Sequence, residues 1–299
     1  MITRRHALLF AATMAMLARA TPAPAQPKLK VLATFSILGD FVRNAGGDRV
    51  EMTTLVGPSS DAHVYAPSPA DAKKVADAKV VIVNGLGFEG WMGRLVSASG
   101  SKAPVVVATK GIAARKIEDG HGHGDADPHA WQAVANAKIY VGNIRDALIA
   151  ADPAGKAAYE ANAAAYLAKL DALDAEVKAA VAAIPAERRK VISTHDAFGY
   201  FQQAYGIEFI APQGVSTESE ASARDVARIV AQIRRQKIPA VFLENVTNPR
   251  LMELIAKESG ARVGGKLYSD ALTDAAGEAP GYIEMMRHNA RQIAAALQG

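Results

Sequence analysis

The sequence predicts an α/β protein with two lobes, each with a four-stranded parallel sheet flanked by helices, joined by one long rigid helix. Short apolar strands alternate with helical stretches in both halves of the chain, which is typical of parallel sheets covered on both faces. One amphipathic stretch separates the halves. The 299 residues are enough for two domains, and 50% hydrophobic with 21% charged residues indicates a globular chain.

Residues 1–25 have the features of a signal peptide. Arg4 and Arg5 form a basic start, the apolar run at 7–17 is too short to span a bilayer, and residues 23–25 fit a cleavage site between small residues. The arginine pair also resembles a twin-arginine signal, so Sec and twin-arginine export both stay open. A leader retained as a membrane anchor is the alternative to cleavage.

Residues 26–150 are expected to form the N-terminal lobe. Four short apolar runs are predicted strands, at 29–35, 50–56, 79–83 and 104–108. Helical stretches such as 68–78 lie between them.

Residues 151–185 are predicted to be the linking helix. Asp152 and Pro153 indicate its start, as N-cap and first-turn residues. Apolar residues then recur every three or four positions, and Pro185 ends the pattern. Roughly 30 residues would span about 45 Å, which is long enough to brace two lobes. Two consecutive helices are the alternative, but they require a break that the pattern does not show.

Residues 186–299 are expected to form the C-terminal lobe. Predicted strands cover 190–194, 208–211, 240–244 and 261–264, and predicted helices cover 222–236 and 249–259. The second half therefore repeats the architecture of the first, without a repeat at the level of residues.

The composition excludes several kinds of partner and metal site. Loss of the leader removes three arginines and no acid, which lowers the formal net charge from +4 to +1. The chain has no block of basic residues interleaved with aromatics, which argues against a nucleic-acid partner. It also has no cysteine, so disulfides and thiolate metal sites are excluded and any metal is held by nitrogen and oxygen.

Three histidines and one aspartate are the candidate metal ligands: His63, His129, His195 and Asp270. They are 66, 66 and 75 positions apart, and each lies where a predicted strand runs out into a loop. Zinc and its neighbours take imidazole nitrogen and carboxylate oxygen, typically as four donors in a tetrahedron. Such distant ligands predict a site that is assembled by folding.

The two candidates of the first lobe each have another interpretation. His63 lies in a loop that Pro67 and Pro69 stiffen, but a lone loop histidine is often exposed and without a role. His129 is predicted near a helix N-terminus, and Trp131 could shield it from water. Alternatively, Trp131 is a core residue and His129 is merely its neighbour.

The candidates of the second lobe are also open to two interpretations. His195 follows a buried strand, and ligands bind at the carboxyl ends of strands in open parallel sheets. Asp196 beside it could cap the next helix rather than bind metal. Asp270 follows a strand-like run and could itself be a helix N-cap.

Three stretches resemble the solute-binding proteins of zinc and manganese ABC importers. They are Asp-x-His-x-Tyr-x-Pro-x-Pro at 61–69, Asp-Pro-His-x-Trp at 127–131 and Thr-His-Asp-Ala-Phe-Gly-Tyr-Phe at 194–201. The resemblance runs from about Leu29 to the C-terminus, and Ala62 departs from it, because the family usually has proline at this position. By position, it implies ligands His63 and His129 from one lobe and His195 and Asp270 from the other, with the metal in the cleft between them.

A glycine-rich loop at 118–127 carries two further histidines and four acids. Zinc members of the resembling family often have a longer loop of this kind. His121 and His123 are therefore candidates for auxiliary metal capture, and a flexible loop without a role is the alternative. His288 lies beside Arg287 and Arg291, and such a cationic setting predicts a structural residue or one without a role.

The donor set predicts zinc, with manganese as the alternative. Manganese members of the resembling family tend to have glutamate where this chain has His195. Imidazole favours zinc and carboxylate shifts the preference towards manganese, so three nitrogens and one carboxylate favour Zn(II) as the transported ligand.

The expected function is high-affinity capture of Zn(II) in the periplasm and delivery to an ABC permease with its ATPase. Both partners are implied by the resemblance; a periplasmic metal chaperone is a further candidate partner, and the protein is expected to be a monomer. A zinc hydrolase with Asp270 as base is the rival function, and an adhesin is a third. The sequence lacks His-Glu-x-x-His and Gly-x-Ser-x-Gly, and four protein donors would leave no position for a reactive water, so we expect no enzyme.

Overall fold

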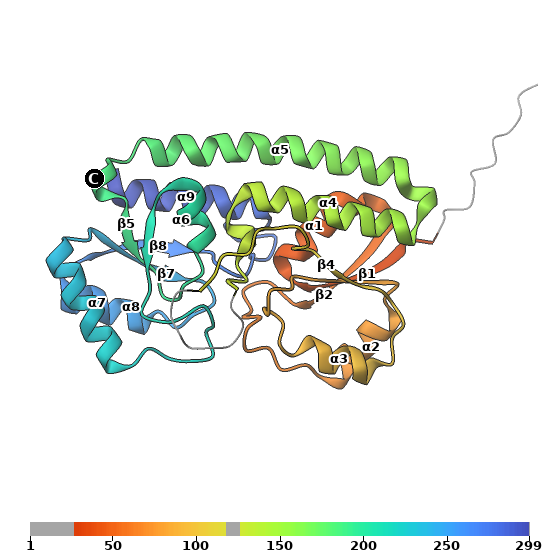
Figure 1. Ribbon diagram of the computed structural model, residues 1–299, viewed down its shortest axis with the longest axis horizontal. Coiled ribbons are helices and arrows are strands. Elements are labelled where there is room, and N and C mark those ends of the chain that lie inside the picture. The colour runs from red at the N-terminus through yellow and green to blue at the C-terminus, as the bar shows by residue number, and fades with distance from the viewer. Residues whose placement is uncertain (1–26, 118–125, 299) are drawn as a thin grey trace, which may run out of the picture.

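The computed structural model describes residues 27–117 and 126–298, and Figure 1 shows two lobes beneath one long helix. The first lobe holds a parallel sheet of order β2-β1-β3-β4, built from β1 (Leu29–Phe35), β2 (Val50–Val56), β3 (Val80–Val83) and β4 (Val105–Val107). Every residue of β3 is buried and apolar, as expected for a strand covered on both faces. One face carries α1 (Ser36–Gly46) and α4 (Val134–Ala151), and the other carries α2 (Pro69–Asp77) and α3 (Met92–Ser99).

The second lobe repeats this arrangement. Its parallel sheet has the order β6-β5-β7-β8, with β5 (Lys190–Ile192), β6 (Glu208–Ile210), β7 (Ala240–Glu244) and β8 (Arg262–Leu267). Its helices are α6 (Gly199–Tyr205), α7 (Ala223–Gln236), α8 (Arg250–Ser259) and α9 (Tyr282–Gln298). Two four-stranded parallel sheets flanked by helices confirm the predicted fold class.

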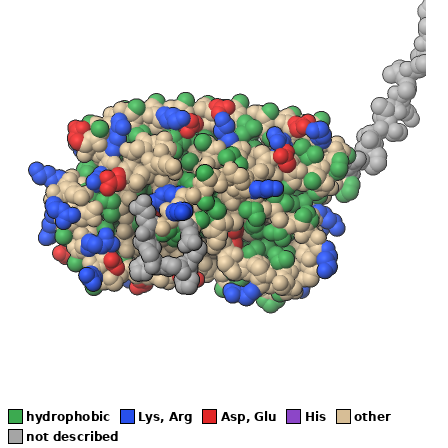
Figure 2. All heavy atoms as spheres, viewed as in Figure 1, with side chains coloured by type: hydrophobic (Ala, Val, Ile, Leu, Met, Phe, Trp, Pro, Cys, Tyr) green, Lys and Arg blue, Asp and Glu red, His purple; other side chains and the backbone are tan. Residues whose placement is uncertain are grey.

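The long helix is α5 (Lys156–Ala182), whose 27 residues pass over both lobes. Its buried stripe contains the residues that the three- and four-residue spacing selects: Tyr159, Ala163, Tyr166, Leu170, Leu173, Val177 and Val181. Figure 2 shows acidic and basic side chains interspersed along its outer face.

The start of α5 differs from the prediction. Pro153–Gly155 forms a separate 3-10 turn before the helix begins. The carboxylate of Asp152 makes no capping bond and instead accepts hydrogen bonds from Arg49 (2.8 Å) and from the hydroxyl of Tyr159 (2.8 Å). Asp152 therefore ties the helix start to the first lobe, rather than satisfying free amides of the first turn.

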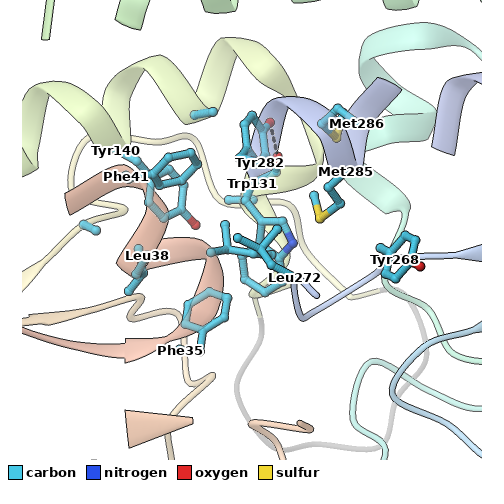
Figure 3. Close-up of a cluster of buried hydrophobic side chains, with 14 of the residues drawn as sticks. Phe35, Leu38, Phe41, Trp131, Tyr140, Tyr268, Leu272, Tyr282, Met285 and Met286 are labelled. Atoms are coloured by element: carbon cyan, nitrogen blue, oxygen red, sulfur yellow. Dashed lines mark hydrogen bonds between the residues drawn. The ribbon is translucent and has the colours of Figure 1, made fainter. Parts of the chain in front are cut away.

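A continuous apolar core joins the two lobes. One cluster of buried side chains runs from β1 to α9, and Figure 3 shows its centre. The ring of Trp131 lies 5.0 Å from that of Phe35, and the hydroxyl of Tyr282 donates to the carbonyl of Trp131 at 2.6 Å. Wide opening of the lobes would break this packing, whose burial stabilises the fold by about 25 cal/mol for each Å² of apolar surface.

The last strand, β8, is longer than predicted because glycines interrupt its apolar pattern. A Cβ at Gly264 would lie 2.7 Å from the ring of Phe242, and Gly265 has a φ of +121°. Nearby, His288 is buried in α9 and its Nε2 lies 2.9 Å from the carbonyl of Lys266. This contact gives His288 a structural role, one of the two predicted outcomes, although the residue lies in the interior.

No helix within residues 27–117 and 126–298 is long and apolar enough to cross a membrane.

Candidate metal centre

The structure brings together His63, His129, His195 and Asp270. One donor atom from each lies within 4.8 Å of the others. Oδ2 of Asp270 is 3.4 Å from Nε2 of His63 and 3.1 Å from Nε2 of His195, while Oδ1 is 3.6 Å from Nε2 of His129. Three Nε2 atoms around one carboxylate are a donor set that could hold a four-coordinate metal ion.

Each lobe supplies two donors from segments that follow its strands. His63 lies in the loop between β2 and α2, and His129 precedes the 3-10 turn Ala130–Gln132. His195 and Asp270 each come three residues after a strand, β5 and β8 respectively. This is the carboxyl edge of the sheets, where open α/β folds bind their ligands.

The cluster lies inside the molecule. The side chains of His129, His195 and Asp270 are fully buried, and that of His63 is 5% exposed. Among the described residues, no histidine side chain is visible on the face drawn in Figure 2. Exclusion of water strengthens every electrostatic interaction within the site.

Two buried carboxylates lie beside Nδ1 of the two fully buried histidines, and the sequence pattern did not single them out as site residues. Asp127 lies with Oδ1 at 2.8 Å from Nδ1 of His129 and accepts that residue's backbone N–H at 2.9 Å. Oε2 of Glu244 lies 2.5 Å from Nδ1 of His195. Carboxylates in this position hold the imidazole with Nε2 facing the metal and raise its basicity.

Their signals in the sequence differ in strength. Asp127 stands two positions before a histidine, just as Asp61 does before His63, and this repeated Asp-x-His spacing could have identified it. Glu244 is one acid at the end of an apolar strand, and only the pairing of β7 with β5 places it beside His195.

The charged groups of the cluster shift one another's pKa values. Burial opposes ionisation of Asp270, but the positive charge available to His195 and His129 outweighs burial and holds the pKa of Asp270 well below its usual range. Burial likewise opposes the charged form of His195, but Glu244 and Asp270 raise its pKa well above 6.5. Burial lowers the pKa of His63. Negative charge from Asp270 and Glu244 therefore makes the cluster favourable for a cation.

The structure also decides two local alternatives. Phe198, not Asp196, occupies the N-cap position of α6, and Oδ2 of Asp196 is 3.9 Å from the guanidinium of Arg115. Asp270 caps no helix, because the next helix begins at Tyr282. His121 and His123 lie outside the described residues.

Trp131 is fully buried and shields the donor cluster. Its ring lies 5.3 Å from that of His129, and its indole N–H donates to the carbonyl of Ser269 at 2.9 Å. It therefore contacts one donor of the first lobe and holds the chain beside Asp270 in the second.

Two lobes braced by one helix, with a buried cluster of metal donors at their junction, define a two-lobed binding protein for a metal ion. The family model described as the periplasmic component A of the zinc-uptake complex matches residues 31–296, and the chain belongs to this family. Its members are substrate-binding proteins of ABC metal importers and not enzymes, which confirms the predicted class.

The relatives carry different metals in their names. The chain is 38% identical over 261 residues to the manganese-binding lipoprotein MntA of Halalkalibacterium halodurans, covering 87% of this chain and 86% of the relative. It is 35% identical over 280 residues to the iron-binding protein YfeA of Yersinia pestis, covering 94% and 90%. The periplasmic zinc-binding protein TroA of Treponema pallidum superposes with a TM-score of 0.86 at 33% identity, covering 91% of this chain and all of that one.

Proposed function

We propose that this protein captures Zn²⁺ in the periplasm with His63, His129, His195 and Asp270 and delivers it to an ABC permease. The donor set carries the proposal, because three buried imidazole nitrogens and one carboxylate suit zinc better than an oxygen-rich site would. Membership of the family supports the importer role, in which a permease and its ATPase are the partners.

Manganese is the second candidate. Several relatives are named for manganese, among them the PsaA lipoprotein of Streptococcus pneumoniae at 34% identity. A bidentate Asp270 would add an oxygen donor and move the site towards the preference of Mn²⁺. In our proposal, the donor at position 195 distinguishes the two metals. Here that donor is the imidazole nitrogen of His195, which favours zinc.

Capture follows from the charges of the cluster. The ionised Asp270 attracts the cation, while Asp127 and Glu244 keep the imidazoles of the two fully buried histidines aimed at it. Because the lobes share one apolar core beneath α5, loading is expected to involve shifts of loops and of the second lobe rather than wide closure.

The proposed mature protein is a periplasmic monomer that has lost residues 1–25, with lobes at 26–150 and 186–299 and the linking helix at 151–185. Some relatives are named lipoproteins. The 299 residues contain no cysteine to which a thioether-linked lipid could be attached. A periplasmic metal chaperone remains a proposed further partner.

Elemental analysis of the protein purified from its native compartment tests the metal directly. The expected result is about one zinc for each chain. Competition titration of the metal-stripped protein provides the second test, and tighter binding of Mn²⁺ than of Zn²⁺ would overturn the zinc assignment.

A further inference from the structure

His63 differs from the other three donors in how it is held. It comes from an irregular loop at 57–68, whereas the other donors are fully buried beside the packed junction of the lobes. Its side chain is the only one of the four with solvent exposure, at 5%. Of the four donors, His63 is therefore the one that lies between the site and solvent.

The loop that carries His63 is bound to the opposite lobe through Asp61. Oδ1 of Asp61 accepts the backbone N–H of His63 at 2.9 Å. Oδ2 of the same carboxylate accepts the hydroxyl of Thr217 at 2.6 Å. Thr217 lies between β6 and α7 in the second lobe, 156 positions along the chain. One carboxylate thus joins the main chain of a donor residue to the other lobe.

A second hydrogen bond crosses between the lobes from the same loop. The backbone N–H of Ser59 donates to the carbonyl of Leu272 at 2.8 Å, two residues beyond Asp270. Ser59 has a φ of +53°, a left-handed conformation that residues other than glycine adopt only where surrounding contacts impose it. Release of these contacts would therefore favour another conformation of the loop.

We propose that Asp61 and Thr217 are positioning residues of the metal centre, whose hydrogen bond holds His63 over the site and whose rupture lets metal enter and leave. The inference rests on the proposed capture of metal by His63. The other donors cannot withdraw without disturbing the shared core. The bond between Asp61 and Thr217, which joins the His63 loop to the second lobe, is only half-buried. The buried bond of this loop, from the indole N–H of Trp91 to the carbonyl of Ala62 (2.9 Å), stays within the first lobe and need not break when the lobes part. A hydrogen bond to a charged group changes an equilibrium constant by roughly 10- to 100-fold, which is enough to control the rate of opening.

Thr217→Val tests the proposal, because valine keeps the shape of threonine and removes the hydroxyl. Zn²⁺-loaded protein is mixed with excess chelator at several concentrations, and the dissociation rate is followed alongside the association rate and the thermal unfolding of the metal-free protein. We expect Zn²⁺ release about tenfold faster than from the wild type, with an unchanged unfolding temperature. The experiment is repeated with Mn²⁺.

Two matched variants make the test specific. Thr217→Ser retains the hydroxyl and is expected to release metal at the wild-type rate. Ser216→Ala removes a neighbouring hydroxyl that accepts the N–H of Glu218 within the same loop, and it is also expected to match the wild type. A Thr217→Val release rate within twofold of the wild type would overturn the inference, as would equal acceleration in either matched variant. Failure of the wild type to bind Zn²⁺ or Mn²⁺ would overturn the proposed function and this inference together.

Discussion

Glu244→Gln tests how far metal binding depends on a carboxylate outside the donor set. Glu244 is 3% exposed, and its Oε1 accepts the backbone N–H groups of Thr194 at 2.7 Å and His195 at 3.1 Å. Glutamine has the same size and retains a carbonyl oxygen for these two bonds. The substitution therefore removes the negative charge beside Nδ1 of His195 and leaves the local backbone in place.

The expected loss of zinc affinity is about 10- to 100-fold, the usual effect of removing a carboxylate behind a metal-bound histidine, or about 1.4–2.8 kcal/mol. The loss depends on pH. Glu244, acting with Asp270 against the effect of burial, raises the pKa of His195, so a proton competes with the metal at neutral pH. Loss of Glu244 weakens this competition. The affinity gap between wild type and variant should therefore be widest near pH 9 and narrow as the pH falls towards 6.

Competition with a chromogenic chelator from pH 6 to pH 9 measures this gap. Glu208→Gln is the matched control, because Glu208 begins β6 on the surface and pairs with Lys190 at 2.9 Å. It should leave affinity unchanged at every pH. A Glu244→Gln dissociation constant within threefold of the wild type at pH 9 would refute the reasoning.

Four further outcomes are expected. His195→Ala should weaken zinc binding more than Asp270→Ala, because zinc prefers nitrogen here, and calorimetry giving the reverse order would count against that geometry. Deleting residues 119–125 should slow zinc uptake by cells, and an unchanged rate would remove the case for auxiliary capture. Solution scattering should show little compaction on adding zinc, since the lobes share a core; a large decrease in radius of gyration would contradict this. Asp71→Ala should lower the free energy of unfolding by about 1–2 kcal/mol in urea titrations, because Asp71 accepts hydrogen bonds from Ser68 at the start of α2. Although burial opposes ionisation, these bonds hold the pKa of Asp71 low. The contribution of Asp71 to the free energy of unfolding is therefore present at neutral pH and is lost only in strong acid. An unchanged free energy of unfolding in the variant at pH 7 would refute this prediction.

Local sequence pattern was enough for the elements that a single run or stripe of apolar residues marks. The bounds of β1, β2 and β7 follow directly from apolar runs, and the buried stripe of α5 follows from its three- and four-residue spacing. The true extent of β8 could not be predicted in this way. Gly264 is required by the ring of Phe242, a contact that the pattern around the glycine does not contain.

The candidate site was predictable as a set of donors but not as an arrangement. The resemblance selected His63, His129, His195 and Asp270, and folding brings them within reach of one another. The groups that support them depend on contacts between distant segments, such as Glu244 beside His195 across neighbouring strands. Sequence spacing carries no information about such contacts until the strand order is known.

Because the donor cluster is divided between the two lobes, a chain that lacks either lobe cannot contain all four donors. Asp270 is the last donor to be synthesised, so a polypeptide that ends before it carries at most three of the four. A fragment that retains a single lobe carries only two. Such unfinished chains and single-lobe fragments therefore lack the complete set of four donors that the whole chain brings together.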